Sequence, residues 1–141
     1  MRAVIQRVIG ASCTTGGRQL AGFDGEGLVV LLGVTHGDGA DAADRMARKI
    51  AELKLLRGDR SVLEAAAPVL VVSQFTLYAD TKKGRKPSWS KAAPGPVAEP
   101  LIERVAASLE DRGLVVGRGA FGADMLVTLA NDGPVTLIVD T

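Results

Sequence analysis

Cysteine and histidine each occur only once in this chain of 141 residues. The single Cys13 rules out an internal disulfide and a cysteine-cluster zinc site, and we expect it to be a small, partly buried strand residue. The single His36 lies in a glycine-rich segment, "THGDG", where a solvated loop residue is favoured over a general base. A zinc hydrolase needs three protein ligands, and a serine or threonine hydrolase needs a neighbouring base. The composition therefore argues against both classes, and we expect no bound metal and no cofactor.

Net charge and long apolar runs are also lacking. Seventeen Lys and Arg residues oppose sixteen Asp and Glu residues, so the net charge is +1 and no protein-wide positive field attracts nucleic acid. We therefore expect no DNA partner, and any RNA contact must be local. The longest apolar run, residues 28–32, is too short to span a membrane, and polar residues 6 and 7 interrupt any signal-peptide core. These features predict a single cytoplasmic domain over residues 1–141 with no membrane partner.

The first half of the chain alternates between strand and helix patterns. Alternation over residues 2–8, a hairpin at Gly16 and Gly17, and the apolar run 27–35 indicate strands, the last covered on both faces. A second long apolar strand is expected over residues 69–79. Between these strands, apolar residues at helical spacing indicate a helix that ends before Gly58: Ala43, Met46, Ala47, Ile50, Leu53 and Leu56.

The second half of the chain predicts one more helix and three more strands. After a loop to about Pro96, a helix with Pro100 in its first turn is expected to stop at Gly113. Strands are expected over residues 114–117, 124–130 and 134–140, the last two joined by a hairpin turn. About seven or eight strands and two helices predict an α+β domain with mixed sheets and helices on one side. The residues expected on the buried face of the second helix are Val97, Leu101, Val105 and Leu109.

Two features invite a ligand-binding interpretation that their context does not support. "GRGAFG" (117–122) matches the dinucleotide fingerprint, but its glycines lead into a strand pattern instead of a helix. Asp38, Asp41 and Asp44 fit no calcium-loop spacing, and favourable charge near a helix N-terminus is the better account. A nucleotide-dependent oxidoreductase is therefore an alternative hypothesis that a dinucleotide titration would test.

Three segments break the pattern of the elements that hold them, and such breaks tend to mark functional sites. Ser73, Gln74 and Thr76 place polar side chains at the end of an apolar strand, where they either line a pocket or tie down the next loop. "TKKGRKPSWSK" (81–91) carries five positive charges around Trp89, which suits phosphates and a stacked base but also fits a solvated charge run.

The third segment is Gly133-Pro134, within "NDGPVT" (131–136). Asp-Gly between two strands would be an ordinary hairpin signal. The proline removes an amide from the following strand and allows the preceding peptide bond to be cis. Because Gly133 has no side chain, another molecule can approach the main-chain carbonyls closely. From the residues alone, a turn is the simpler interpretation.

"SQFTL" (73–77) and "NDGPVT" (131–136) together closely resemble the two signature motifs of the D-aminoacyl-tRNA deacylases, also called D-tyrosyl-tRNA deacylases. The resemblance implies a cytoplasmic homodimer with active sites at the subunit interface and a barrel-like β-β-α sandwich fold. It also implies a hydrolase that cleaves the ester joining a D-amino acid to the 3′ end of tRNA, as a proofreading step in translation. Glycine mischarged on tRNA(Ala) would be a second substrate. Four further matches follow in the family's order along the whole chain: "IQRV" (5–8), "LLGV" (31–34), "RKPSWSKAAP" (85–94) and "FGADM" (121–125).

The same resemblance implies roles for residues of the first motif, "SQFTL", and of the segment 81–91, which we call the basic loop. Gln74, Phe75 and Thr76 would be the catalytic part of the pocket, with Thr76 and nearby main-chain groups around the scissile carbonyl, and Ser73 would bind substrate. The basic residues that would contact the tRNA are Lys82, Lys83, Arg85 and Lys86.

For the second motif, the resemblance implies a filter made of main-chain atoms. Gly133 and Pro134 would form a cis pair inserted into the partner subunit's pocket, where their carbonyls hold the substrate's amino group and leave no room for an L side chain. Arg7 would buttress this pair, while Phe121 and Met125 would shape the adenosine side of the pocket. A filter of this kind excludes L substrates sterically and does not by itself distinguish glycine from a D residue.

The scarcity of bases agrees with this chemistry. Without a base, Thr76 is a poor nucleophile, so we favour water attack assisted by the 2′-hydroxyl of the terminal ribose, with main-chain amides stabilising the oxyanion. Departures from the family pattern are modest. The segment 58–68 is shorter than is common in the family, and Trp89 and Gly122 stand where phenylalanine and alanine are usual. A noncatalytic module that binds the tRNA end remains the alternative from another class.

Overall fold

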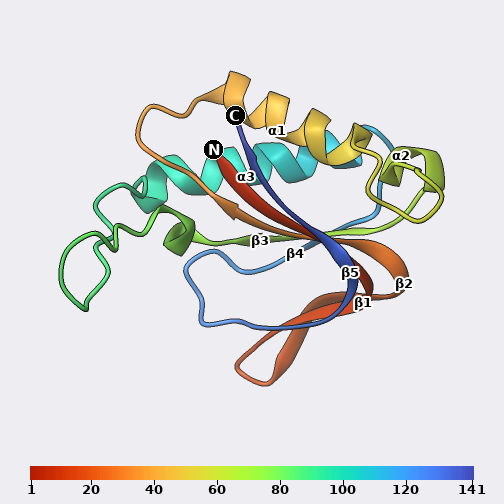
Figure 1. The fold of residues 1–141 in the computed structure, drawn as a ribbon, viewed down its shortest axis with the longest axis horizontal. Coiled ribbons are helices and arrows are strands. Elements are labelled where there is room, and N and C mark those ends of the chain that lie inside the picture. Colours follow the sequence, from red (N-terminus) through yellow and green to blue (C-terminus); the bar gives the residue numbers. More distant parts are fainter.

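The computed structural model describes residues 1–141 as a mixed sheet with helices packed on one face (Figure 1). The expected α+β class is confirmed. The elements in chain order are β1 (Arg2–Thr15), β2 (Arg18–Gly33), α1 (Ala40–Glu52), α2 (Val62–Ala65), β3 (Val69–Ser73), the 3-10 helix η1 (Phe75–Tyr78), α3 (Gly95–Glu110), β4 (Val116–Arg118) and β5 (Leu126–Asp140).

The five strands form one sheet in the order β4-β3-β2-β1-β5. β1 is antiparallel to β2 and β5, whereas β3 runs parallel to both β2 and β4. The β1–β2 turn lies at Gly16 and Gly17, as expected, and both glycines have positive φ. Because β4 and β5 are free edges, the sheet is open and does not close into a barrel.

Two apolar clusters cover the two faces of the sheet. The larger one lies between the sheet and the helices and includes Ile5 and Val30 from strands and Ile50 and Val105 from α1 and α3. The smaller one, on the other face, includes Val29 and is covered by partly buried side chains such as Val127. The prediction that residues 27–35 form a strand covered on both faces is therefore confirmed for Leu28 to Leu32. Cys13 belongs to the smaller cluster and is fully buried instead of partly buried, and its burial raises the pKa of the thiol.

The predicted hairpin turn at residues 131–136 is wrong. Residues 126–140 form one long strand, β5, that follows β1 along its whole length. Between the pairs Gln6–Thr136 and Val8–Asn131, β1 advances two residues while β5 advances five, so the motif forms a large bulge in β5. β5 joins two predicted strands, and β1 and β2 each join an arm of the predicted hairpin to a neighbouring predicted strand, so the sheet has five strands instead of seven or eight.

Other element boundaries differ because tertiary packing overrides local pattern. The strand expected over residues 69–79 ends at Ser73 and continues as η1. The first helix ends at Glu52, so Leu53 and Leu56 lie beyond it.

The second helix also differs from its prediction. α3 begins at Gly95, which places Pro96 in the first turn and Pro100 inside the helix. Its buried face contains Val105 and Leu109 as expected, but Val97 is exposed and Leu101 only partly buried; Ala98, Ile102 and Ala106 complete the face.

Candidate active site

The first predicted motif lies where β3 ends. Ser73 is the last residue of β3 and pairs with Leu32 of β2, and the Gln74 amide donates to the Leu32 carbonyl at 2.8 Å. The chain then turns into η1, whose first hydrogen bond runs from the Leu77 amide to the Gln74 carbonyl at 3.2 Å. The amides of Phe75 and Thr76 therefore have no acceptor within the turn. Two adjacent amides of this kind suit a developing oxyanion.

Two cavities flank this strand end, of about 350 Å³ and about 270 Å³. Ser73, Gln74, Phe75 and Gly122 line both cavities. The larger one is mostly apolar and is completed by Leu32, Val34, Trp89, Ala92, Ala93, Gly95, Ala98, Ile102 and Phe121. The smaller one is completed by Val72, Ala123, Asp124, Met125 and Val127.

Phe121 and Met125 reach the site from the loop between β4 and β5. Phe121 lies next to Gly95, where an added Cβ would come within 3.4 Å of its ring. The Met125 sulfur accepts from the Ala120 amide at 3.2 Å. The glycine-rich segment 117–122 thus leads from β4 into this loop and not into a helix, as predicted, and it forms one wall of the site.

Thr76 and Gln74 interact through their side chains, with the Gln74 amide nitrogen donating to the Thr76 hydroxyl. Thr76 lines neither cavity, and its hydroxyl has no carboxylate or imidazole partner. The only histidine, His36, contacts the Ser90 carbonyl at 3.0 Å and is exposed. The arrangement therefore provides main-chain donors at the site but no base beside the threonine.

The basic loop lies at the same end of the sheet as η1 (Figure 1). Its base is held by paired main-chain hydrogen bonds between Asp80 and Ser88, at 2.8 and 2.9 Å, and by an ion pair of Lys91 with Asp80 at 2.9 Å. The pKa of the Asp80 carboxyl is lowered by the Lys82 amide and by Lys91. The four predicted tRNA-binding residues, Lys82, Lys83, Arg85 and Lys86, are all exposed on this loop.

Arg7, Gly133 and Pro134 line neither cavity of their own chain. The Gly133-Pro134 bond is cis, as the resemblance implied, and both residues are exposed on the β5 bulge. Arg7 is only 7% exposed and donates to the main-chain carbonyls of Asp132, at 3.1 Å, and Gly133, at 3.3 Å. Arg7 therefore contacts the pair that it was expected to buttress, but the structure of one chain does not bring the pair to Ser73.

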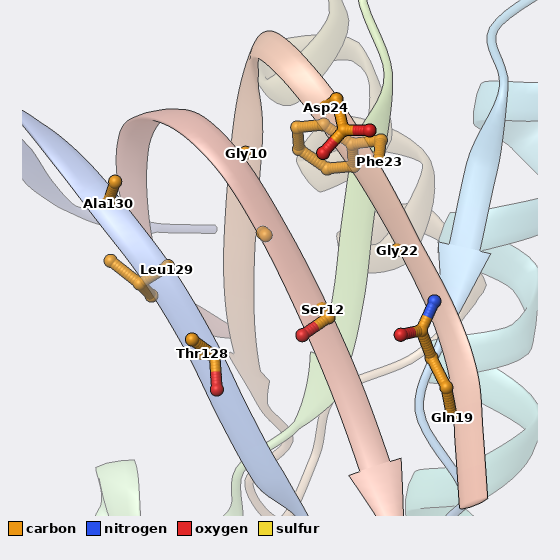
Figure 2. A pocket seen from close by; sticks show the side chains of 10 residues that line it. Gly10, Ser12, Gln19, Gly22, Phe23, Asp24, Thr128, Leu129 and Ala130 are labelled. Atoms are coloured by element: carbon orange, nitrogen blue, oxygen red, sulfur yellow. The ribbon is translucent and has the colours of Figure 1, made fainter.

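A third hollow, of about 580 Å³, lies away from these residues on β1, β2 and β5 (Figure 2). Ser12, Gln19 and Thr128 point polar groups toward it, and small residues such as Gly10 and Gly22 leave it open. None of the predicted site residues lines it.

A family model described as D-Tyr-tRNA(Tyr) deacylase matches residues 4–140. The chain belongs to this family. The family resemblance of the two motifs is thereby confirmed, and with it the interpretation of the chain as an enzyme of the deacylase class. No helix of this deacylase family member is long and apolar enough to cross a membrane.

Individual relatives agree with the family assignment. Proteins named D-aminoacyl-tRNA deacylase from Kineococcus radiotolerans and Beutenbergia cavernae are 56% and 58% identical over 140 residues, which is 99% of both chains in each comparison. A solved structure titled "c-Myc DNA Unwinding Element Binding Protein" is 37% identical with a TM-score of 0.90 and covers 100% of this chain and 99% of its own. Another, titled "Structural Analysis of a probable eukaryotic D-amino acid tRNA deacylase", has a TM-score of 0.86 at 16% identity, covers 99% of this chain and 98% of its own, and shows the shared fold.

Sequence reasoning missed several residues that shape the site. Ala92, Ala93 and Gly95 line the larger cavity, and although "RKPSWSKAAP" (85–94) is one of the family matches, the sequence predicts no pocket role for these residues. Asp132, within the β5 bulge, forms an ion pair with Arg57 at 2.5 Å. The place of Asp132 directly before Gly133-Pro134 was a usable signal, whereas nothing in the sequence around Arg57 indicates this contact.

Proposed function

We propose that this deacylase hydrolyses the ester bond of D-aminoacyl-tRNA, releasing the free D-amino acid and tRNA, and that residues 1–141 act as one such domain in the cytoplasm. The observation that carries the proposal is the pair of unpaired amides at Phe75 and Thr76, next to two cavities that share Ser73, Gln74 and Phe75. Amides held by a rigid turn are preorganised to stabilise the negative charge that develops on a carbonyl oxygen during ester hydrolysis.

The attacking group in this proposal is water. Thr76 lacks a base, so its hydroxyl is a weak nucleophile at neutral pH. The 2′-hydroxyl of the substrate's terminal ribose lies beside the ester oxygen in any aminoacyl-tRNA and assists the water, while the amides of Phe75 and Thr76 receive the oxyanion. Gln74 orients the Thr76 side chain, and Ser73, Phe121 and Met125 surround the terminal adenosine.

Selection against L substrates is proposed to come from a second copy of the chain. Gly133 and Pro134 are exposed and line neither cavity of their own chain, so this part of the bulge is accessible to the pocket of a partner subunit. There they would accept hydrogen bonds from the substrate's amino group and leave no space for an L side chain. A glycyl group has no side chain to exclude, so glycyl-tRNA(Ala) is also a proposed substrate.

Nucleic-acid binding is proposed to be local and limited to the 3′ end of tRNA, without a DNA partner. Lys82, Lys83, Arg85 and Lys86 lie on one loop next to the larger cavity, which Trp89 of the same loop lines. Four positive charges there would pair with phosphates close to the terminal adenosine.

The deciding experiment compares D-tyrosyl-tRNA and L-tyrosyl-tRNA as substrates, with glycyl-tRNA(Ala) as a third. We expect rapid loss of the D ester, loss of the glycyl ester and little loss of the L ester above the uncatalysed rate. Equal inertness toward all three would overturn the proposal, and tight binding without ester loss would favour a noncatalytic module.

Activity should also fall on dilution to the monomer, since each pocket needs the partner's Gly133. An active monomer would contradict the shared site.

A further inference from the structure

The Gly133 carbonyl lies in a part of β5 that the sheet does not hold. Between the pairs Gln6–Thr136 and Val8–Asn131, the residues from Asp132 to Val135 have no pairing partners on β1. A carbonyl in an unpaired and exposed bulge needs other contacts to keep a fixed direction. Those contacts come from side chains of β1 and of the loop that follows α1.

Arg7 supplies the first set of contacts. Its guanidinium donates to the carbonyls of Asp132, Gly133 and Leu55, at 3.1, 3.3 and 3.2 Å, and pairs with the Asp132 carboxylate at 3.0 Å. The Arg7 side chain is 9% exposed and the Asp132 side chain 10% exposed. Since a buried cation without a counter-charge is strongly unfavourable, Asp132 is needed to keep Arg7 in this position.

Arg57 supplies the second set. Its guanidinium donates two hydrogen bonds to the Asp132 carboxylate, from Nε to Oδ2 at 3.0 Å and from Nη2 to Oδ1 at 2.5 Å. The Arg57 main chain is itself fixed, because its amide donates to Glu26 of β2 at 2.7 Å, and Glu26 also binds Arg60 at 2.9 Å. The Arg57 guanidinium, followed by that of Arg7, lowers the pKa of Asp132, which keeps the carboxylate charged at neutral pH.

We propose that Asp132 and Arg57 are positioning residues that hold the Gly133 carbonyl in the direction needed to read the substrate's amino group. The inference rests on the proposed function, because it assigns a task to the Gly133-Pro134 filter. Arg57 touches neither cavity and acts through Asp132 and Arg7. Without Arg57, Asp132 keeps only one cationic partner, so the bulge carrying the Gly133 carbonyl gains freedom. Recognition of the D substrate then weakens, and the L substrate is excluded less strictly.

The test uses the full-length enzyme with Arg57→Ala, Arg57→Lys and a matched control. Arg104→Ala is the control, since Arg104 donates to Asp44 through two nitrogens at 2.7 and 2.8 Å, is half exposed and pairs with α1 instead of β5. For Arg57→Ala we expect kcat/KM with D-tyrosyl-tRNA to fall about tenfold, the effect of one lost charge-assisted contact, and the ratio of D to L rates to fall with it. Arg57→Lys should restore part of the activity, because it returns the charge without the two-nitrogen geometry. Arg104→Ala should match the wild type.

A second measurement does not depend on activity. Hydrogen exchange over residues 126–140 should be faster in Arg57→Ala than in either the wild type or Arg104→Ala, because the bulge is less restrained. Unchanged exchange, or an unchanged ratio of D to L rates in an active enzyme, would overturn the positioning role. A wild type that is inert toward the D substrate would instead overturn the proposed function, and the exchange result would still decide whether Arg57 restrains the bulge.

Discussion

Phe75 and Trp89 meet edge to face, with ring centroids 5.3 Å apart and planes inclined at 78°. Phe75 belongs to η1 and Trp89 to the basic loop, so this contact joins the strand end with the unpaired amides to the segment that carries the positive charges. Both side chains line the larger cavity, yet they are 56% and 41% exposed. Large aromatic surfaces left this accessible beside a cavity are suited to stacking on a base.

Replacing Trp89 should therefore weaken substrate binding more than chemistry. Stacking of one base on an aromatic side chain contributes about 1–3 kcal/mol, so Trp89→Ala should raise KM for D-aminoacyl-tRNA by about tenfold while kcat changes little. Trp89→Phe keeps a ring and should retain most of the affinity. Steady-state kinetics of the two variants decide this, and an unchanged KM in Trp89→Ala would exclude a stacking role.

The basic loop should make binding depend on salt. Each phosphate contact to a single strand contributes about 0.7 to the slope of log affinity against log salt, so replacing Lys82, Lys83, Arg85 and Lys86 by alanine should reduce this slope by up to about 3. The matched control removes four exposed charges elsewhere: Arg45, Arg48, Lys49 and Arg112. KM measured across a salt series separates the two variants. Equal effects of both would mean that only net charge matters.

Much of the core of the fold was predictable because periodicity reports burial directly. The apolar run 27–35 predicts a strand buried on both faces, and the structure confirms this. The helical spacing of Met46 and Ile50 predicts the buried face of a helix, which the structure also confirms. Element ends were less predictable. The polar residues from Ser73 onward do mark the end of the strand, but the hydrogen bond of the Gln74 amide to the Leu32 carbonyl, which precedes η1, joins segments far apart in the sequence.

The candidate site, like the fold, was predictable in part. Ser73, Gln74, Phe75 and Thr76, together with Phe121 and Met125, were expected to share a pocket, and the structure places all of them except Thr76 around two adjoining cavities. "NDGPVT" looked like a hairpin because local turn chemistry is the strongest short-range signal. Its true form depends on long-range pairing with β1 and on the buried Arg7, neither of which local residue patterns report.

Thr76→Ala should separate main-chain catalysis from nucleophilic catalysis. If the amides of Phe75 and Thr76 stabilise the oxyanion and water attacks, loss of the hydroxyl should lower kcat by less than about tenfold. Loss of a true nucleophile typically costs a factor of at least about 10⁴. Single-turnover rates with D-tyrosyl-tRNA distinguish the two cases, and a drop of the larger size, with no change in KM, would assign the attack to Thr76. Gln74→Ala serves as a companion variant, because it removes the hydrogen bond to Thr76 while leaving the hydroxyl.

Tyr78, the only tyrosine, gives a direct pH prediction. Partial burial, with Asp38 and Asp140 nearby, raises its pKa from 10.0 to about 12, and the Arg2 guanidinium 5.6 Å from the ring centre opposes this only in part. Because the folded pKa is the higher one, the unfolded chain releases this proton first as pH rises. The contribution to stability is therefore fully present below pH 10.0 and is lost as pH rises toward about 12. Absorbance of the tyrosinate should show a midpoint near 12 in the folded protein, and urea unfolding across this range should lose less stability in Tyr78→Phe than in the wild type. An ordinary midpoint, or identical pH slopes for the two proteins, would show that solvent reaches the phenol freely.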